Sequence, residues 1–425
     1  MQFSTSPQNN FLTATASAIH SSANSTALLQ SKDANVFSEP LQNLNRSSSN
    51  LSAGNSQRVD LNGDGRADLF WYNNQTGETR AWLMNQKGSP TVVHYGKVSP
   101  SSGWGLQGLG DFNGDGKTDL FWYNFYTGKT ATWFMDGSNS PTAIAHDSMS
   151  PQAGWKFKGL GDFNGDGKTD LFWYNDQNGG KTTAWLMNGS KAPTIVHYSS
   201  VSPTSGWKLQ GFSDLNGDGK TDVLWHNTVT DSTVAWLMNG NQAATGASLG
   251  TISPGSGWSM QGLGDFNGDG KADLFLYNAQ TGGTQIRYVK GANAIAIADY
   301  GSRSAQNGWT FEGIGDFDGN GKMDLFWYNR QTGKTEAWLM NGLTDPTVSS
   351  RYQDISSYWD LQALGDFNGD GKTEVFWRNY GLSNAGTRIW SIGTNSKQST
   401  ASHPPEPTES GWQLISTNQM SGIAI

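Results

Sequence analysis

The sequence contains no cysteine, so it offers neither disulfide bonds nor thiolate metal sites. Charged residues make up only 15% of the 425 residues, and no apolar run approaches the ~20 residues of a membrane span. The formal net charge of −8 argues against nucleic acid as a partner. Nucleophile elbows, zinc-type histidine clusters and phosphate-binding loops are also absent, so the sequence does not favour an enzyme, and a hydrolase or lyase is the less favoured alternative.

Glycine and tryptophan are abundant instead, with 54 and 19 residues, and they belong to a repeat. The stretch GDFNGDGKTD occupies 110–119 and recurs unchanged at 161–170. Close variants place the same acidic cluster seven times, at steps of 50 to 52 residues. The clusters begin at Asp60, Asp111, Asp162, Asp214, Asp265, Asp316 and Asp366. A fixed period of this size predicts a repeat architecture over 59–425.

Residues 1–58 differ from the repeats, because they are rich in serine and asparagine and show no periodicity. With few charges and few aromatic residues to bury, this segment is predicted to be a flexible leader. The weakly apolar stretch FLTATASAI at 11–19 has no preceding lysine or arginine, so it is a poor secretion signal. The overall composition nevertheless fits an extracellular or cell-surface protein of the all-β class.

Five of the seven acidic clusters have the pattern D-x-N-x-D-G-x-x-D, as in Asp111, Asn113, Asp115 and Asp119, and the other two are close variants of it. Oxygen ligands at positions 1, 3, 5 and 9, with glycine at position 6, can surround a hard cation such as Ca²⁺. Three neighbouring carboxylates repel one another unless a cation or protons offset their charge. Asparagine, aspartate and glycine also form ordinary turns, which explains one such loop but not seven in register.

The sequence therefore predicts up to seven calcium ions. The predicted side-chain ligands are Asp60, Asn62, Asp64, Asp68, Asp111, Asn113, Asp115, Asp119, Asp162, Asn164, Asp166, Asp170, Asp214, Asn216, Asp218, Asp222, Asp265, Asn267, Asp269, Asp273, Asp316, Asp318, Asn320, Asp324, Asp366, Asn368, Asp370 and Glu374. Backbone carbonyls at position 7 are expected to contribute from Arg66, Lys117, Lys168, Lys220, Lys271, Lys322 and Lys372. In the sixth loop the acid and amide are exchanged at Asp318 and Asn320, and Glu374 gives the seventh loop a longer arm, so that site is expected to be weaker or looser.

The flanks of each loop predict strands rather than helices. In the third repeat, 155–162 enters the loop and 170–174 leaves it, and two more strands are expected at 182–188 and 193–198. Four short antiparallel strands per repeat, seven times over, predict a seven-bladed β-propeller. The first loop has no entering strand and the last strand, 410–417, has no loop. The C-terminal strand is therefore expected to complete the first blade and close the ring, which removes two exposed sheet edges.

These units resemble the FG-GAP/VCBS repeats of integrin α-subunit propellers, whose D-x-D/N-x-D-G-x-x-D loops bind calcium. They are also similar to the repeats of fungal seven-bladed lectins. The resemblance covers about 60–417 and implies metal ligation at positions 1, 3, 5 and 9 of each loop. It does not fix the function, because one fold serves many functions.

All 19 tryptophans fall into three repeated places. One set follows LF in the second strand and another lies in or near AWLMNG, where packing between blades is the simpler interpretation. The third set opens the first strand after a polar loop, and these residues either pack or stack on sugar rings: Trp104, Trp155, Trp207, Trp258, Trp309, Trp359 and Trp412. We expect a non-catalytic protein that binds glycans multivalently as a lectin or adhesin. The alternative is a scaffold that binds cell-surface proteins.

Overall fold

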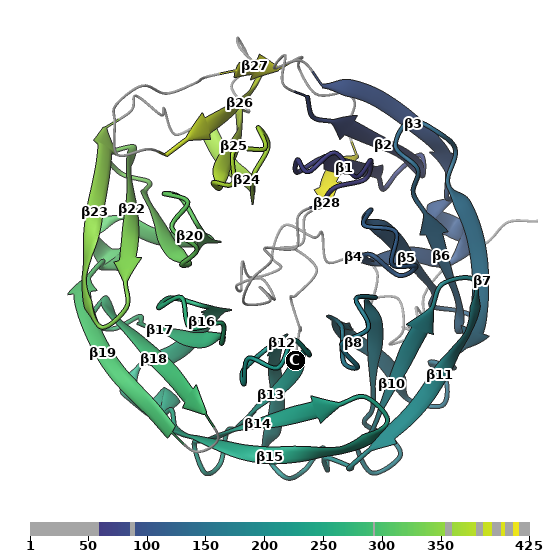
Figure 1. Ribbon diagram of the computed structural model, residues 1–425, viewed down its shortest axis with the longest axis horizontal. Helices are drawn as coiled ribbons and strands as arrows, with labels where there is room; N and C mark the ends of the chain where they lie inside the picture. The colour runs from purple at the N-terminus through teal and green to yellow at the C-terminus, as the bar shows by residue number, and fades with distance from the viewer. Residues whose placement is uncertain are drawn as a thin grey trace, which may run out of the picture. The chain divides into compact units, whose positions relative to one another are not determined.

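The computed structural model describes residues 59–85, 90–291, 294–352, 359–379, 386–392, 401–403 and 411–415. These residues all lie in one unit of the chain, Leu44–Ile425. Their strands form seven separate four-stranded antiparallel sheets, arranged in a ring as the blades of a propeller (Figure 1). The predicted fold class is therefore confirmed, whereas the predicted leader at 1–58 lies outside the described residues.

Each of the first four blades has its first strand at the centre of the ring and its fourth strand at the outside (Figure 1). Blade one contains β28 (Trp412–Ile415), β1 (Leu69–Asn73), β2 (Glu78–Leu83) and β3 (Thr91–Lys97). Blade two contains β4 (Trp104–Gly110), β5 (Asp119–Asn124), β6 (Lys129–Phe134) and β7 (Thr142–Ser148). Blade three contains β8 (Trp155–Gly161), β9 (Asp170–Asn175), β10 (Lys181–Asn188) and β11 (Lys191–Tyr198). Blade four contains β12 (Trp207–Ser213), β13 (Asp222–Asn227), β14 (Ser232–Asn239) and β15 (Gln242–Thr251).

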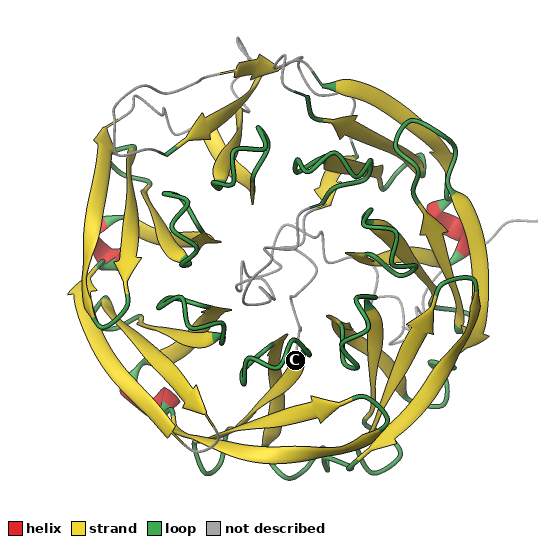
Figure 2. Ribbon diagram, in the orientation of Figure 1, coloured by secondary structure: helices red, strands yellow, loops and turns green. Residues whose placement is uncertain are grey.

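The last three blades keep the same order. Blade five contains β16 (Trp258–Gly264), β17 (Asp273–Asn278), β18 (Gly283–Gly291) and β19 (Ala294–Ser302). Blade six contains β20 (Trp309–Gly315), β21 (Asp324–Asn329), β22 (Lys334–Asn341) and β23 (Thr344–Tyr352). Blade seven contains β24 (Trp359–Gly365), β25 (Glu374–Asn379), β26 (Gly386–Ser391) and β27 (Ala401–His403). Short 3-10 helices lie in three of the linkers between blades, at η3 (Pro100–Ser102), η4 (Pro254–Ser256) and η5 (Ala305–Asn307) (Figure 2).

The ring closes as the offset of the repeats predicts. Strand β28, from the C-terminal end of the chain, pairs antiparallel with β1 in blade one. The register places Asn73 opposite Trp412 and Phe70 opposite Ile415. Blade one therefore has four strands like the others, and the inner edge of β1 is paired rather than open.

Packing between blades explains why the second strands are apolar on both faces. All six residues of β5 are buried, and the cores formed by these strands join neighbouring blades. One such core combines Phe121 and Tyr123 of blade two with Trp173 and Trp185 of blade three. A strand that contacts another blade on each side has no solvent face, so its apolar residues do not alternate with polar ones. In the described part of the chain, no helix is long and apolar enough to span a membrane.

Candidate metal loops and tryptophan pockets

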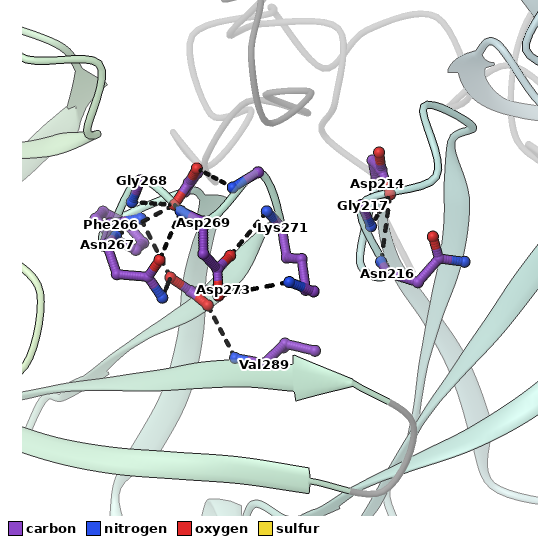
Figure 3. A network of polar contacts seen from close by, with 12 residues as sticks. Asp214, Asn216, Gly217, Phe266, Asn267, Gly268, Asp269, Lys271, Asp273 and Val289 are labelled. Carbon is purple, nitrogen blue, oxygen red and sulfur yellow. Dashed lines mark hydrogen bonds and ion pairs between the residues drawn. The ribbon is translucent and has the colours of Figure 1, made fainter.

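The seven acidic loops lie around the inner rim of the ring (Figure 2). Six of them connect the first strand of a blade to the second, and the loop of blade one leads into β1. The loop of blade five shows how each is held together (Figure 3). Asp265 at position 1 accepts hydrogen bonds from the backbone N–H groups of Gly268 and Gly270, at N···O distances of 2.6 and 2.8 Å. At position 3, Asn267 Oδ1 accepts from Asp269 N at 2.8 Å. The side chains at positions 1 and 3 therefore lie on the inside of a single tight turn.

The carboxylate at position 9 anchors the loop to the sheet. Asp273 Oδ2 accepts from Phe266 N at 3.2 Å, while Oδ1 accepts from Val289 N in the third strand at 2.8 Å (Figure 3). Burial is the main cause that raises the pKa of Asp273 to about 8, and the nearby carboxylates of Asp265 and Asp269 add to the shift. Burial likewise raises the pKa of the other position 9 carboxyls, to about 8 or about 7, and that of Asp170 rises as well: Asp68, Asp119, Asp170, Asp222, Asp324 and Glu374.

These buried carboxylates fit a bound cation. In the sixth loop, carboxylate oxygens of Asp316, Asp318 and Asp324 lie within 4.8 Å of one another. The lysines and the arginine at position 7 do not neutralise position 9, because the ion pairs they form within the described loops go to position 5, as from Lys168 to Asp166 at 3.2 Å. An oxygen-rich set with excess buried negative charge suits a hard divalent ion such as Ca²⁺. Positions 1, 3, 5 and 9 and the carbonyl at position 7 are the groups that would hold it.

The seventh loop differs in the way expected from its glutamate. Glu374 Oε2 accepts from Phe367 N at 2.9 Å, as the aspartates do at this position. Its other oxygen accepts from Asn368 Nδ2 at 2.8 Å and from the Ser391 hydroxyl at 3.3 Å, instead of from a backbone N–H of the third strand. The longer side chain of Glu374 therefore has different hydrogen-bond partners. Weaker binding of the ion in the seventh loop stays a prediction.

Backbone hydrogen bonds join the seven loops to one another. In every blade, the N–H at position 8 donates to the carbonyl at position 1 of the preceding loop. The seven links, with N···O distances of 2.6 to 2.7 Å, are Thr118 to Asp60, Thr169 to Asp111, Thr221 to Asp162, Ala272 to Asp214, Met323 to Asp265, Thr373 to Asp316 and Ala67 to Asp366. The last link connects the first loop to the seventh, so the chain of bonds is a closed circle.

The raised pKa values predict how the metal-free protein responds to pH. We expect its free energy of unfolding to fall as pH rises from about 4 to about 8. In this window the folded protein retains protons on carboxyls such as Asp273, whose pKa is about 8, whereas the unfolded chain releases them near 3.8. Urea midpoints measured in chelator at about pH 5 and about pH 8 test this. The decline should be shallower in Asp273→Asn, and a midpoint that increases with pH would contradict the prediction.

The three sets of tryptophans occupy different depths. The second-strand tryptophans are 0–3% exposed, as their packing interpretation predicts: Trp71, Trp122, Trp173, Trp225, Trp327 and Trp377. The opener tryptophans, which begin the first strand of each blade, are partly exposed except for Trp412. In the third strand, Trp133 and Trp236 are partly exposed and the others are buried. In six blades, one tryptophan from each set lies on the same face, as Trp207, Trp225 and Trp236 do in blade four, whereas blade five has Leu276 and Arg287 in place of two of them. We call this face of each blade its tryptophan pocket.

The tryptophan pocket of blade four contains a cavity of about 370 Å³. Its walls are Trp207, Trp225 and Trp236 with Val234, and the linker from blade three closes it with Ser200, Val201, Ser202 and Ser205. The indole N–H of Trp225 is buried and has no hydrogen-bond acceptor in the protein. The N–H groups of Trp71, Trp122, Trp173, Trp327 and Trp377 are in the same state, so this feature does not set blade four apart. What the pocket combines is flat apolar rings with nearby hydroxyls, as sites for small polar ligands do.

Two kinds of pocket residue were not predicted from the sequence. The first lies two residues before the third-strand tryptophan, where it is Val234 in blade four and Arg80 in blade one. The second is the linker residue whose carbonyl accepts from a tyrosine hydroxyl of the preceding blade, such as Val201, bonded by Tyr174 at 2.8 Å. Both positions vary between repeats, while the tryptophans around them are the same in six of the seven blades. A comparison of the seven repeats with one another at these two positions could have identified these pocket residues from the sequence.

Similar solved structures confirm the propeller. A lectin from Agrocybe aegerita, described as recognising non-reducing terminal N-acetylglucosamine, has a TM-score of 0.59 at 14% identity, over 83% of this chain and 95% of that one. Prolyl oligopeptidase B from Galerina marginata has a TM-score of 0.53 at 9% identity, over 85% of this chain and 52% of that one. No curated protein matches the chain. At these identities the likeness concerns the fold alone.

The match to a family model is more specific. The model of the FG-GAP-like repeat matches at 60–122, 111–173, 214–276 and 316–377, which together span more than half of the chain. Each match begins at position 1 of an acidic loop and ends in the second strand of the next blade, at Trp122, Trp173, Leu276 and Trp377. The chain therefore belongs to the FG-GAP-like repeat family.

Proposed function

We propose that the protein is a non-catalytic, extracellular glycan-binding propeller whose inner loops bind calcium. The observation that carries this proposal is the cavity of about 370 Å³ between blades three and four, walled by Trp207, Trp225 and Trp236. Its volume lies within the range of small-molecule sites. A pyranose ring has an apolar face of C–H groups and an equator of hydroxyls, and these match flat indoles beside serine hydroxyls.

The polar groups of the cavity support a sugar over a purely apolar ligand. Three serines, Ser200, Ser202 and Ser205, line the cavity beside the indole rings and offer hydroxyl or backbone groups to a ligand. Ser205 already donates to the carbonyl of Ser202 at 2.6 Å, so its oxygen remains available as an acceptor. The lining residues carry no charge, which suits a neutral sugar. The similarity to a fungal lectin propeller is consistent with this proposal.

Calcium has a structural part in the proposal. The loops lie at the inner rim, where each leads into the second strand of its blade and contacts the next blade. Extracellular calcium modules bind with Kd values of ~10⁻⁴–10⁻³ M, which suits millimolar calcium outside cells. A rigid ring with more than one sugar pocket gains avidity for a multivalent surface, by a factor of ~10²–10⁴ over a single pocket.

A glycan array with soluble-sugar competition tests the proposal. We expect binding to a subset of glycans and inhibition by a simple neutral sugar, with N-acetylglucosamine as the first competitor. Trp207→Ala removes one wall of the pocket and should weaken the array signal by about tenfold, because the stacking surface is lost. A melting curve shows whether this variant is folded. Absence of glycan binding, or binding that no simple sugar inhibits, would favour the protein-binding scaffold.

A further inference from the structure

The seven tryptophan pockets are not equivalent, because different side chains stand over the rings. At the position two residues before the third-strand tryptophan, the chain has Arg80, Ala131, Thr183, Val234, Gln285, Glu336 and Arg388 in blades one to seven. The described linkers into blades two to six add Val98, Met149, Val201, Ile252 and Arg303. The contacts of these residues decide which pockets are open.

Arginine covers the pockets of blades one and seven. The guanidinium carbon of Arg80 lies 4.4 Å from the ring centre of Trp412, and that of Arg388 lies 4.7 Å from the ring centre of Trp359. A guanidinium at this distance is held by the cation–π attraction, worth ~0.5–2 kcal/mol. It lies on the ring face where a sugar would stack, so a sugar must first displace it.

In blade six the cover comes from the linker. Arg303 lies over both Trp309 and Trp338, with its guanidinium carbon 5.2 and 4.6 Å from the two ring centres. Arg303 Nε donates to Glu336 Oε2 at 2.6 Å, and Lys334 Nζ lies 2.7 Å from the other carboxylate oxygen. The side chain of Glu336 is only 4% exposed, so this ion-paired group fills the pocket.

Blades three and five are closed in two further ways. In blade three, Met149 is buried in the same core as Trp173 and Trp185, which are themselves buried. In blade five, Arg287 replaces the third-strand tryptophan, and its Nη1 donates to the carbonyl of Thr251, the last residue of β15, at 2.6 Å. Its Nε donates to Gln285 Oε1 at 3.0 Å. Polar groups thus bridge the place where blade four has its cavity.

Among the described residues, only those of blades two and four combine small residues with open rings. Blade four has Val201 and Val234, and blade two has Val98 and Ala131 at the same two places. In these two blades both the opener and the third-strand tryptophan are partly exposed: Trp104 with Trp133, and Trp207 with Trp236. No charged side chain stands at either covering position.

We propose that blades two and four hold the glycan sites, that both take neutral pyranoses, and that the other five pockets are closed. The proposal rests on the proposed glycan-binding function and adds its stoichiometry, location and ligand class. It also modifies the expectation for the seven opener tryptophans, because it assigns stacking to Trp104 and Trp207 alone. Acidic sugars gain no cationic partner from the two covering positions, so neutral sugars are preferred.

Substitutions that copy the closed blades test the proposal. The probe is the neutral monosaccharide that inhibits most strongly on the array, with N-acetylglucosamine, galactose, mannose and fucose as the panel. Equilibrium dialysis should find two sugars bound per chain. Val234→Arg places in blade four the residue that covers blades one and seven, and Ala131→Arg does the same in blade two. Each should reduce the bound sugar to one per chain, and the double variant should bind none.

One control and two further variants separate closure from misfolding. Val348→Arg makes the same chemical change at a 44% exposed position of β23 and should leave two sugars bound. Val201→Met copies the cover of blade three with a milder change and should also remove one site. In the opposite direction, Arg80→Ala uncovers Trp412 and should raise the number to three. Melting curves establish that each variant is folded.

The outcomes distinguish this proposal from the function on which it rests. Inhibitable glycan binding with more than two sugars per chain, or binding that persists in the folded double variant, would overturn the two-pocket assignment and leave the lectin proposal standing. Absence of inhibitable binding to any glycan would overturn both. Two sites that are lost one at a time, with Val348→Arg unchanged, would support both.

Discussion

Removal of calcium with a chelator is expected to lower the melting temperature of the protein on the order of 10 °C, and millimolar calcium should restore it. Each ion that binds only the folded state stabilises it by RT ln(1 + [Ca²⁺]/Kd), which is about 1.4 kcal/mol at ten times Kd. Seven such ions would contribute on the order of 10 kcal/mol. Without calcium, the buried carboxylates of the seven loops repel one another. We therefore expect the calcium-free protein to be less stable than the calcium-bound protein.

Metal analysis of a position 9 variant tests the same sites individually. Asp119→Ala removes the carboxylate that accepts from Phe112 N and Met135 N, at 3.1 and 2.9 Å, so one ion in seven should be lost. Asp147→Ala is the matched control, because it removes an exposed aspartate of β7 outside the loops and should leave the ion count unchanged. Identical melting curves with and without chelator would contradict a structural part for calcium.

Deletion of residues 411–425 is expected to have the second large effect. It removes β28, and with it the buried side chains of Trp412, Leu414 and Ile415 from the cores between blades. Burial of three such side chains contributes roughly 5 kcal/mol or more. The deletion also leaves the inner edge of β1 unpaired, which is a template for association with other chains. We expect aggregation during size-exclusion chromatography and a broad, non-cooperative thermal transition.

The matched control for this deletion is a shorter one. Removal of residues 416–425 leaves all of β28 in place, so chain length changes while the pairing with β1 is kept. This protein should remain monodisperse if the pairing is what matters. A soluble 411–425 deletion that unfolds cooperatively at the original temperature would show that closure through β28 is dispensable.

The architecture followed from the sequence because the repeats supply it seven times. In the third repeat, the four expected strands agree with the structure to within two residues, including β8 at Trp155–Gly161 and β11 at Lys191–Tyr198. The pairing of β28 with β1 followed from counting, since the tryptophan openers and acidic loops are equal in number but out of step. Both inferences depend on local patterns and on their order along the chain.

The state of the tryptophan pockets did not follow, because it depends on side chains that meet only in the folded ring. Met149 and Arg303 belong to linkers between blades, and nothing local in the sequence shows which indole each will cover. Arg80 stands two strands away from Trp412 within its sheet and at the opposite end of the propeller sequence. The hydrogen bonds between the acidic loops could not be predicted from the sequence either, because they join backbone groups, which every residue type except proline provides in full.

The seven hydrogen bonds between the acidic loops form a closed circle, so the inner rim has no end at which unfolding would begin. A linear array of repeats has two terminal units, each supported on one side only, and these fray first. Here the bond from Ala67 to the carbonyl of Asp366 leaves no terminal unit, so each acidic loop is held by a neighbour on both sides. If any single link opens, the other six still join all seven loops in one piece, and the opened link stays close to its partner and can re-form.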